Sequence, residues 1–278
     1  MRYDRAIILT DLDGTLFNSS GVVSPDDRSA IRAFVDGGGL FAIASGREPH
    51  NALLHLRDIP LNGPSIVLNG AAIYDFVQGR YLMTIPLDKT AAADVLRFCQ
   101  ERHLPLDQQV YTPEGIFYAT PLESADPEYL RIHQPTSYVP MPQLINMEWL
   151  KIVMLEREPG VLGPMRDYLT LRGHDRRLNL VEGTTDVVKV GKYQELLPQG
   201  IHKGTALSSL RRMPCCEGRT YFAVGDYWND MELLQASDIP CAPENAIQEI
   251  KAVCRHILPS HNDSPIAHLI RTIIPAEN

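Results

Sequence analysis

Aspartates stand at the ends of two apolar segments, where carboxylates can act on a bound ligand. Asp11 and Asp13 come directly after the apolar run at 6–10, and a second polar group follows the apolar run at 220–224. This second group consists of Asp226, Asn229 and Asp230. Open parallel sheets bind ligands at the carboxyl ends of their strands. We therefore expect these carboxylates to converge at one edge of a sheet.

Carboxylates that converge in this way repel one another, by several kcal/mol at ~4 Å in a partly buried site. A hard divalent cation removes the conflict, and Mg²⁺ suits a site of one or two carboxylates, water and phosphate oxygens. The pattern therefore predicts a Mg²⁺ site. Beside the metal, one ionised aspartate can attack phosphorus, and a second can act as general acid and base.

Phosphoryl oxygens also need donors and positive charge. Lys203 lies at an expected helix start in GIHKGTAL and is the best candidate cation. The hydroxyl of Ser45, at the end of the apolar run LFAIA, and the backbone N–H groups after it can hold another oxygen.

The elements that position these residues alternate between strand and helix. Strands are expected at 6–10, 40–47 and 65–70, with a helix at about 25–36 that Ser24 caps. This alternation favours right-handed parallel crossovers. The same style returns in a helix at 202–212 and a strand at 220–226.

Between these parts the pattern changes to hairpins mixed with helices. Helices are expected at 88–103 and 161–171, a hairpin at 108–119, a strand at 149–155, two strands within 178–190, and long loops at 120–146. We predict an α/β fold in which residues 1–84 and 194–278 form a Rossmann-like parallel-sheet core. An α+β insert at 85–193 interrupts this core.

Composition restricts the class of partner. The chain has 278 residues, is 44% hydrophobic and 22% charged, and carries a formal charge of −8. An acidic chain repels a phosphate backbone, so we expect no broad binding to nucleic acid or to anionic membranes. A small anionic substrate stays compatible, because a local site can hold cations.

The cysteine pattern and hydropathy favour a cytoplasmic protein. The five cysteines are Cys99, Cys215, Cys216, Cys241 and Cys254. Their odd number and spacing fit neither a metal site nor a disulfide framework, which indicates free thiols in a reducing compartment. The N-terminal segment does not resemble a signal peptide, and no segment reaches about 18 uninterrupted apolar residues.

Four motifs in this order, DLDGTLFN, ASGR, HKGTAL and GDYWNDMELL, resemble those of the haloacid dehalogenase-like phosphohydrolases. The arrangement resembles the Cof-type branch, which carries a large α+β cap between the second and third motifs. The resemblance covers essentially the whole chain. One departure lies in PENAIQEI and HNDSPIAHLI, because the family more often has Met-Gly before Asn-Ala and a longer acidic loop; this affects Asn245 and Asn262.

The resemblance implies a role for each matching residue. Asp11 would be the phosphorylated nucleophile and Asp13 the general acid and base. Mg²⁺ would be held by the Asp11 carboxylate, the Asp13 backbone carbonyl and Asp226, and Asp230 and Asn229 would orient these ligands or join them.

The remaining matches concern the substrate. Lys203 would neutralise developing charge, and Ser45 and Gly46 would hold the phosphoryl group. Asn69 matches a position near the substrate phosphate. Arg47 fits either a surface salt bridge or a substrate contact.

The resulting hypothesis is a Mg²⁺-dependent phosphatase for small phosphorylated metabolites that works through an aspartyl-phosphate. Two alternatives remain: a phosphotransferase or mutase similar to phosphomannomutases, and a ligand-binding module without activity. Sugar phosphates, nucleotides, pyridoxal phosphate and flavin mononucleotide all fit as substrates. The sequence does not predict an oligomeric state.

Overall fold

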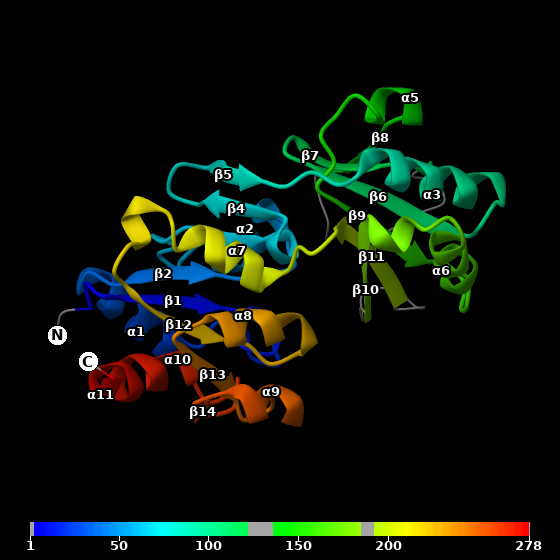
Figure 1. Ribbon diagram of the computed structural model, residues 1–278. Helices are drawn as coiled ribbons and strands as arrows, with labels where there is room; N and C mark the ends of the chain where they lie inside the picture. The colour runs from blue at the N-terminus through cyan, green and yellow to red at the C-terminus, as the bar shows by residue number, and fades with distance from the viewer. Residues whose placement is uncertain (1–2, 122–135, 185–191, 278) are drawn as a thin grey trace. The chain divides into compact units, whose positions relative to one another are not determined.

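The computed structural model describes residues 3–121, 136–184 and 192–277, and the chain forms two compact units (Figure 1). The first unit comprises residues 1–83 and 202–278, and the second comprises residues 84–201. The predicted class, an α/β protein with a parallel sheet and a further α+β part, is confirmed.

The first unit contains both ends of the chain. Its strands are β1 (Ala6–Thr10), β2 (Leu40–Ile43), β3 (Ser65–Val67), β4 (Ala72–Asp75), β5 (Arg80–Thr84), β12 (Thr220–Val224), β13 (Ile239–Pro243) and β14 (His256–Leu258). Its helices are α1 (Pro25–Asp36), α2 (Pro49–Leu56), α7 (Lys203–Leu210), α8 (Met231–Ala236), α9 (Gln248–Val253), α10 (Pro265–His268) and α11 (Ile274–Glu277). Short helical turns are η1 (Leu68–Gly70), η4 (Pro214–Cys216), η5 (Trp228–Asp230) and η6 (Leu269–Ile273).

A five-stranded parallel sheet in the order β14-β13-β12-β1-β2 forms the centre of this unit. β1 lies between β2 and β12, with Ile8 opposite both Phe41 and Phe222. The chain leaves β1 toward one side of the sheet and returns much later on the other side. The strand order therefore reverses between β1 and β12, which is the place where open α/β sheets bind ligands.

Helices cover both faces of this sheet (Figure 1). On one face α1 and α10 pack with alternate strand residues such as Ile8, Phe41 and Phe222. On the other face α7, α8 and α9 pack with the intervening residues, for example Ile7. All five residues of β1 are buried, which explains its continuous apolar sequence. The carboxylates that follow β1 are therefore held by a fully packed strand.

The strand expected at 65–70 is shorter in the structure, where β3 covers only Ser65–Val67. Its neighbour on one side is parallel and its neighbour on the other side, β4, is antiparallel. β3 is joined to the parallel sheet by the Ala44–Ile66 bridge and by the bond from the Ile43 N–H to Ser65 Oγ, and it pairs antiparallel with β4. Leu68 and Asn69 then adopt positive φ angles of 53° and 54°. This left-handed backbone ends the strand before Asn69 and turns the chain there.

The second unit has its own sheet and core. Its elements are α3 (Lys89–Glu101), β6 (Leu106–Thr112), β7 (Gly115–Tyr118), β8 (Thr136–Tyr138), α5 (Met141–Leu144), β9 (Lys151–Glu156), α6 (Leu162–Leu171), η3 (His174–Arg176), β10 (Leu178–Thr184) and β11 (Lys192–Pro198). The described strands run in the order β10-β11-β9-β6-β7-β8. α3 and α6 pack against alternate residues such as Val110, Ile152 and Leu196.

Some expected limits differ from the structure. The boundary expected at residue 193 falls inside β11, which pairs with β9 and β10, so the second unit continues to residue 201. Within the expected loop at 120–146, β8 and α5 are ordered elements, while residues 122–135 lie outside the described part. The strand expected to end at 190 also falls largely outside it. No helix in the described ranges is long and apolar enough to cross a bilayer.

Candidate active site

A buried lysine joins two carboxylates that come from distant parts of the chain. Lys203 Nζ donates to Asp11 Oδ1 at 2.7 Å and to Asp230 Oδ1 at 2.6 Å. The side chains of Lys203 and Asp230 are fully buried, and that of Asp11 is nearly so. Residues from the first and last thirds of the chain thus meet at the carboxyl edge of β1 and β12, as expected from the sequence.

The position of Lys203 follows from the packing of α7. Lys203 is the first residue of this helix, and His202 caps it by accepting from the Thr205 N–H. A Cβ atom at Gly204 would lie 2.3 Å from the Glu232 carbonyl of α8. Glycine therefore allows α7 and α8 to approach closely, and this approach brings Lys203 to Asp230.

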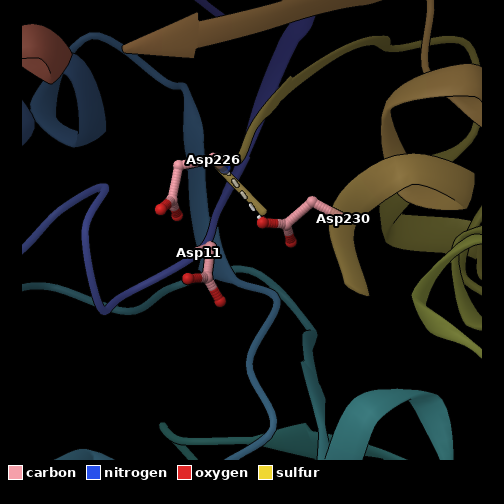
Figure 2. A group of neighbouring side chains, drawn as sticks. All are labelled: Asp11, Asp226 and Asp230. Atoms are coloured by element: carbon pink, nitrogen blue, oxygen red, sulfur yellow. Dashed lines mark hydrogen bonds between the residues drawn. The ribbon is translucent and has the colours of Figure 1, made fainter. Parts of the chain in front are cut away.

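Asp226 completes a group of three carboxylates (Figure 2). One oxygen from each of Asp11, Asp226 and Asp230 lies within 4.8 Å of the others. Asp230 Oδ2 accepts from the Asp226 N–H at 3.0 Å, and Thr15 Oγ1 donates to Asp226 Oδ1 at 2.8 Å. A Cβ atom at Gly14, where φ is +76°, would lie 2.5 Å from Asp226 Oδ2, so only glycine leaves room for this carboxylate.

The three carboxylates carry more negative charge than Lys203 neutralises. Burial raises the pKa of Asp11 well above its ordinary value, and the charges of Asp230 and Asp226 add to the rise although Lys203 opposes it. Burial, together with the charge of Asp230, also raises the pKa of Asp226 to about 6. For Lys203, burial favours the neutral amine, but the two bonded carboxylates outweigh it and raise the pKa, so this lysine stays charged.

The residues present fit a Mg²⁺ ion. One ammonium among three ionised carboxylates leaves two negative charges, which a divalent cation would balance. Carboxylate oxygens are hard ligands, and oxygens on opposite sides of a Mg²⁺ ion lie about 4 Å apart. Described hydrogen bonds occupy both oxygens of Asp230 but one oxygen each of Asp11 and Asp226. Asp11 and Asp226 would therefore be the better direct ligands, and Asp230 would orient them.

The carboxylate of Asp13 lies outside this group and forms an ion pair. Arg47 Nε and Nη2 donate to its two oxygens at 2.9 and 2.7 Å, and Arg47 Nη1 donates to Asn51 Oδ1 at 2.7 Å. Of the two interpretations of Arg47, the structure shows the salt bridge, and the substrate contact stays a prediction. The metal ligand predicted at Asp13 was its backbone carbonyl, and this stays a prediction.

The remaining predicted residues gather beside β2. Ser45 is buried, and its Oγ accepts from the Arg47 N–H at 3.2 Å. Asn69 approaches this turn through its N–H, which donates to the Ser45 carbonyl at 3.0 Å, and its Oδ1 accepts from Asn229 Nδ2 at 3.3 Å. A Cβ atom at Gly46 would lie 3.0 Å from the Asn69 amide. These residues form one polar wall of the site.

The sequence reasoning assigned no role to several residues that shape the site. Thr15 holds Asp226, Gly14 leaves space for it, and Asn51 fixes Arg47. Gly14 and Thr15 stand inside DLDGTLFN, so their place in the motif was the available signal. Asn51 lies outside the motifs. Its contact with Arg47 arises only because the first turn of α2 faces that side chain in the folded protein.

Comparison with known proteins places this geometry in a family. The model of the haloacid dehalogenase-like hydrolases matches residues 8–270. A phosphatase from Bacillus subtilis is 25% identical over 96% of this chain and 99% of its own length. The pyridoxal phosphate phosphatase of Escherichia coli is 22% identical, over 95% of this chain and 97% of its own.

Solved structures share the fold. A haloacid dehalogenase-like hydrolase from Bacteroides thetaiotaomicron has a TM-score of 0.80 at 22% identity, covering 96% of this chain and 99% of that one. A protein from Thermotoga maritima has a TM-score of 0.78 at 23% identity, covering 97% of both chains. The predicted family and enzyme class are confirmed. The chain belongs to the haloacid dehalogenase-like hydrolases of the Cof type.

Proposed function

We propose that the chain is a Mg²⁺-dependent phosphatase that hydrolyses small phosphorylated metabolites through an aspartyl-phosphate intermediate. The observation that carries this proposal is the group of three carboxylates around Lys203 at the reversal point of the parallel sheet. Related proteins support the substrate class. One from Escherichia coli is named for pyridoxal phosphate, and one from Bacillus subtilis for 5-amino-6-(5-phospho-D-ribitylamino)uracil.

In the first step the Asp11 carboxylate attacks phosphorus, and the ester oxygen leaves. The bond from Lys203 Nζ to Asp11 Oδ1 fixes the orientation of this carboxylate. Asp13 gives its proton to the leaving oxygen, and the carboxylate that results is the form that Arg47 holds through two bonds. Bound Mg²⁺ would screen the repulsion between the carboxylate and the phosphoryl oxygens.

In the second step Asp13 takes a proton from water, and the water attacks phosphorus to release phosphate and restore Asp11. The Ser45 hydroxyl and the Gly46 N–H would donate to phosphoryl oxygens in both steps. The Asn69–Asn229 pair would keep this wall in place. The second unit would select the leaving group, in the role expected of the cap.

The test is phosphate release from a panel of sugar phosphates, nucleotides, pyridoxal phosphate and flavin mononucleotide, with and without Mg²⁺. Asp11→Asn should lower turnover by about 10⁴-fold or more while the protein still folds. Asp58→Asn is the matched control, because Asp58 is an exposed aspartate that pairs with Arg28. Mass spectrometry of the acid-quenched wild type should find a phosphoryl group on Asp11.

Product analysis separates the alternatives. Transfer to a hydroxyl of the bound sugar would give an isomeric phosphate in place of free phosphate. A folded Asp11→Asn variant with near-normal turnover would refute the assigned nucleophile. Absence of hydrolysis of p-nitrophenyl phosphate and acetyl phosphate with Mg²⁺ would favour a binding module.

A further inference from the structure

Three loops at the carboxyl edge of the parallel sheet are joined through Asn245. This residue lies in the loop after β13 and is exposed. Its Nδ2 donates to the Gly14 carbonyl at 2.8 Å, and its Oδ1 accepts from the His261 N–H at 2.9 Å. One side chain thus links the loop after β1 to the loop after β14.

The same two loops meet again at Ser19. The Ser19 N–H donates to Asn262 Oδ1 at 2.9 Å, and Asn262 Nδ2 donates to Ser19 Oγ at 3.0 Å. Ser19 Oγ also lies 3.0 Å from His261 Nε2. We call these four residues, Ser19, Asn245, His261 and Asn262, the loop clasp. It holds the loop after β1 at two points, Gly14 and Ser19.

The clasp acts on the segment that positions Asp226. Gly14 lies against the Asp226 carboxylate, and Thr15 donates to its Oδ1. From the other side, the Ile247 N–H, two residues after Asn245, donates to the Asp226 carbonyl at 3.2 Å. Asn245 therefore ties together two of the segments that contact Asp226.

We propose that Asn245 is a positioning residue that holds Gly14 and Thr15 against Asp226 and so sets the affinity of the carboxylate group for Mg²⁺. This inference rests on one part of the proposed function, the binding of Mg²⁺ by the three carboxylates. It assigns to Asn245 and Asn262, which stand where the chain departs from its family pattern, a role in metal affinity. Groups that orient a metal ligand typically change affinity 10- to 100-fold, and an indirect contact through a loop should have less effect.

The test measures Mg²⁺ binding to the substrate-free protein by calorimetry, with Mn²⁺ paramagnetic resonance as a second probe. Asn245→Ala should weaken binding by about three- to tenfold. The half-saturating Mg²⁺ concentration for phosphate release should rise by the same factor, while kcat at saturating Mg²⁺ stays near that of the wild type. Ser19→Ala removes the two contacts of Ser19 Oγ and keeps the bond from its N–H, so it should give a smaller change in the same direction.

Asn245→Asp separates the two bonds of Asn245. The carboxylate can still accept from the His261 N–H but cannot donate to the Gly14 carbonyl. Its added negative charge would by itself strengthen Mg²⁺ binding, so weaker binding in this variant would assign the effect to the Gly14 bond. The Asn245→Asp variant also provides the test of the Gly14 bond if Asn245→Ala fails to fold. The matched control is Asn146→Ala, another exposed asparagine whose Nδ2 donates to a carbonyl, that of Pro142.

The outcomes distinguish this inference from the proposed function. Unchanged Mg²⁺ affinity in a folded Asn245→Ala variant, or stronger binding in Asn245→Asp, would overturn the inference and leave the phosphatase proposal intact. A loss of kcat at saturating Mg²⁺ with unchanged affinity would also overturn it. A wild type that binds no Mg²⁺ would refute the metal requirement itself.

Discussion

Each unit of the protein buries a lysine beside a carboxylate, but the surroundings differ. In the second unit Lys151 on β9 donates to Glu195 on β11 at 2.7 Å, and its ammonium lies 4.8 Å from the centre of the Tyr111 ring. In the first unit Lys203 bonds two carboxylates, and Asp226 lies in the same group. Within the described residues, Glu195 belongs to no such group of three acids.

This comparison teaches that a buried lysine alone does not mark an active site. A buried ion pair can simply join two strands, as it does between β9 and β11. The excess of carboxylates over cations distinguishes the first unit, because burial and mutual repulsion raise the pKa of Asp226 to about 6 and that of Asp11 as well. A bound cation would favour the ionised form of such a group.

The largest expected effect is at Lys203. Lys203→Met should reduce kcat at saturating Mg²⁺ on the order of 10⁴-fold, because the nucleophile loses its orienting bond and the phosphoryl group loses positive charge. Initial rates on protein whose folding is verified by circular dichroism provide the measurement. Lys151→Met, assayed in parallel, should leave the kcat of the folded fraction near that of the wild type. Equal losses in both variants would erase the distinction between the two lysines.

The Lys151–Glu195 pair should matter for the stability of the second unit. Lys151→Met leaves Glu195 buried without its ammonium partner and should destabilise the second unit by about 3–5 kcal/mol. Replacing both residues, as Lys151→Met with Glu195→Leu, should restore most of this loss, since apolar residues can substitute for a buried pair. Hydrogen exchange of β9 and β11 amides measures this unit separately. A double variant as unstable as the single one would show that the carboxylate is not the source of the cost.

Mg²⁺ should stabilise the protein in a pH-dependent way. Without metal, the raised pKa of Asp226 means that the folded state binds a proton more tightly than the unfolded state, so stability falls as the pH rises from about 4 to about 6. Bound Mg²⁺ favours the ionised form, so its stabilisation should be small at pH 5 and reach about 2.7 kcal/mol at pH 7.5 when Mg²⁺ is at 100 times its Kd. Thermal unfolding with and without Mg²⁺ at several pH values measures it. Asp226→Asn should remove the Mg²⁺ effect, and a pH-independent gain in the wild type would count against these ligands.

The sequence predicted the parts of the site that lie within short motifs. Buried strand β1 and helix α1 have strong local signals in the AIIL run and in the Ser24 cap with Pro25, and both occur as expected. The meeting of the two chain ends followed from the rule for parallel sheets. The geometry brings together Asp11, Asp226, Asp230 and Lys203, whose individual roles stay proposals.

Contacts between distant loops were beyond sequence reasoning. The direction of the Asp13 carboxylate depends on Arg47, which depends in turn on Asn51. Likewise the bond from Asn245 to Gly14 joins residues that no local pattern relates. In the second unit, the extent of β11 depends on antiparallel partners in β9 and β10, so its sequence alone did not fix the boundary.

The Asp13–Arg47 ion pair differs from the two buried lysine pairs because it is partly exposed. With 63% of the Asp13 side chain accessible, the pair should add little to stability. Its role should instead be to stabilise and orient the carboxylate that forms when Asp13 gives up its proton, which matters most for poor leaving groups. Arg47→Ala should therefore lower kcat for an alkyl phosphate by about 10- to 30-fold, part of the 10²- to 10⁴-fold that acid catalysis provides, and change little for p-nitrophenyl phosphate. Arg28→Ala, which opens another partly exposed pair, formed with Asp58 outside the four motifs, should affect neither substrate. An equal loss with both substrates would mean that Arg47 binds the phosphoryl group, and the choice left open by the sequence would be decided in favour of a substrate contact.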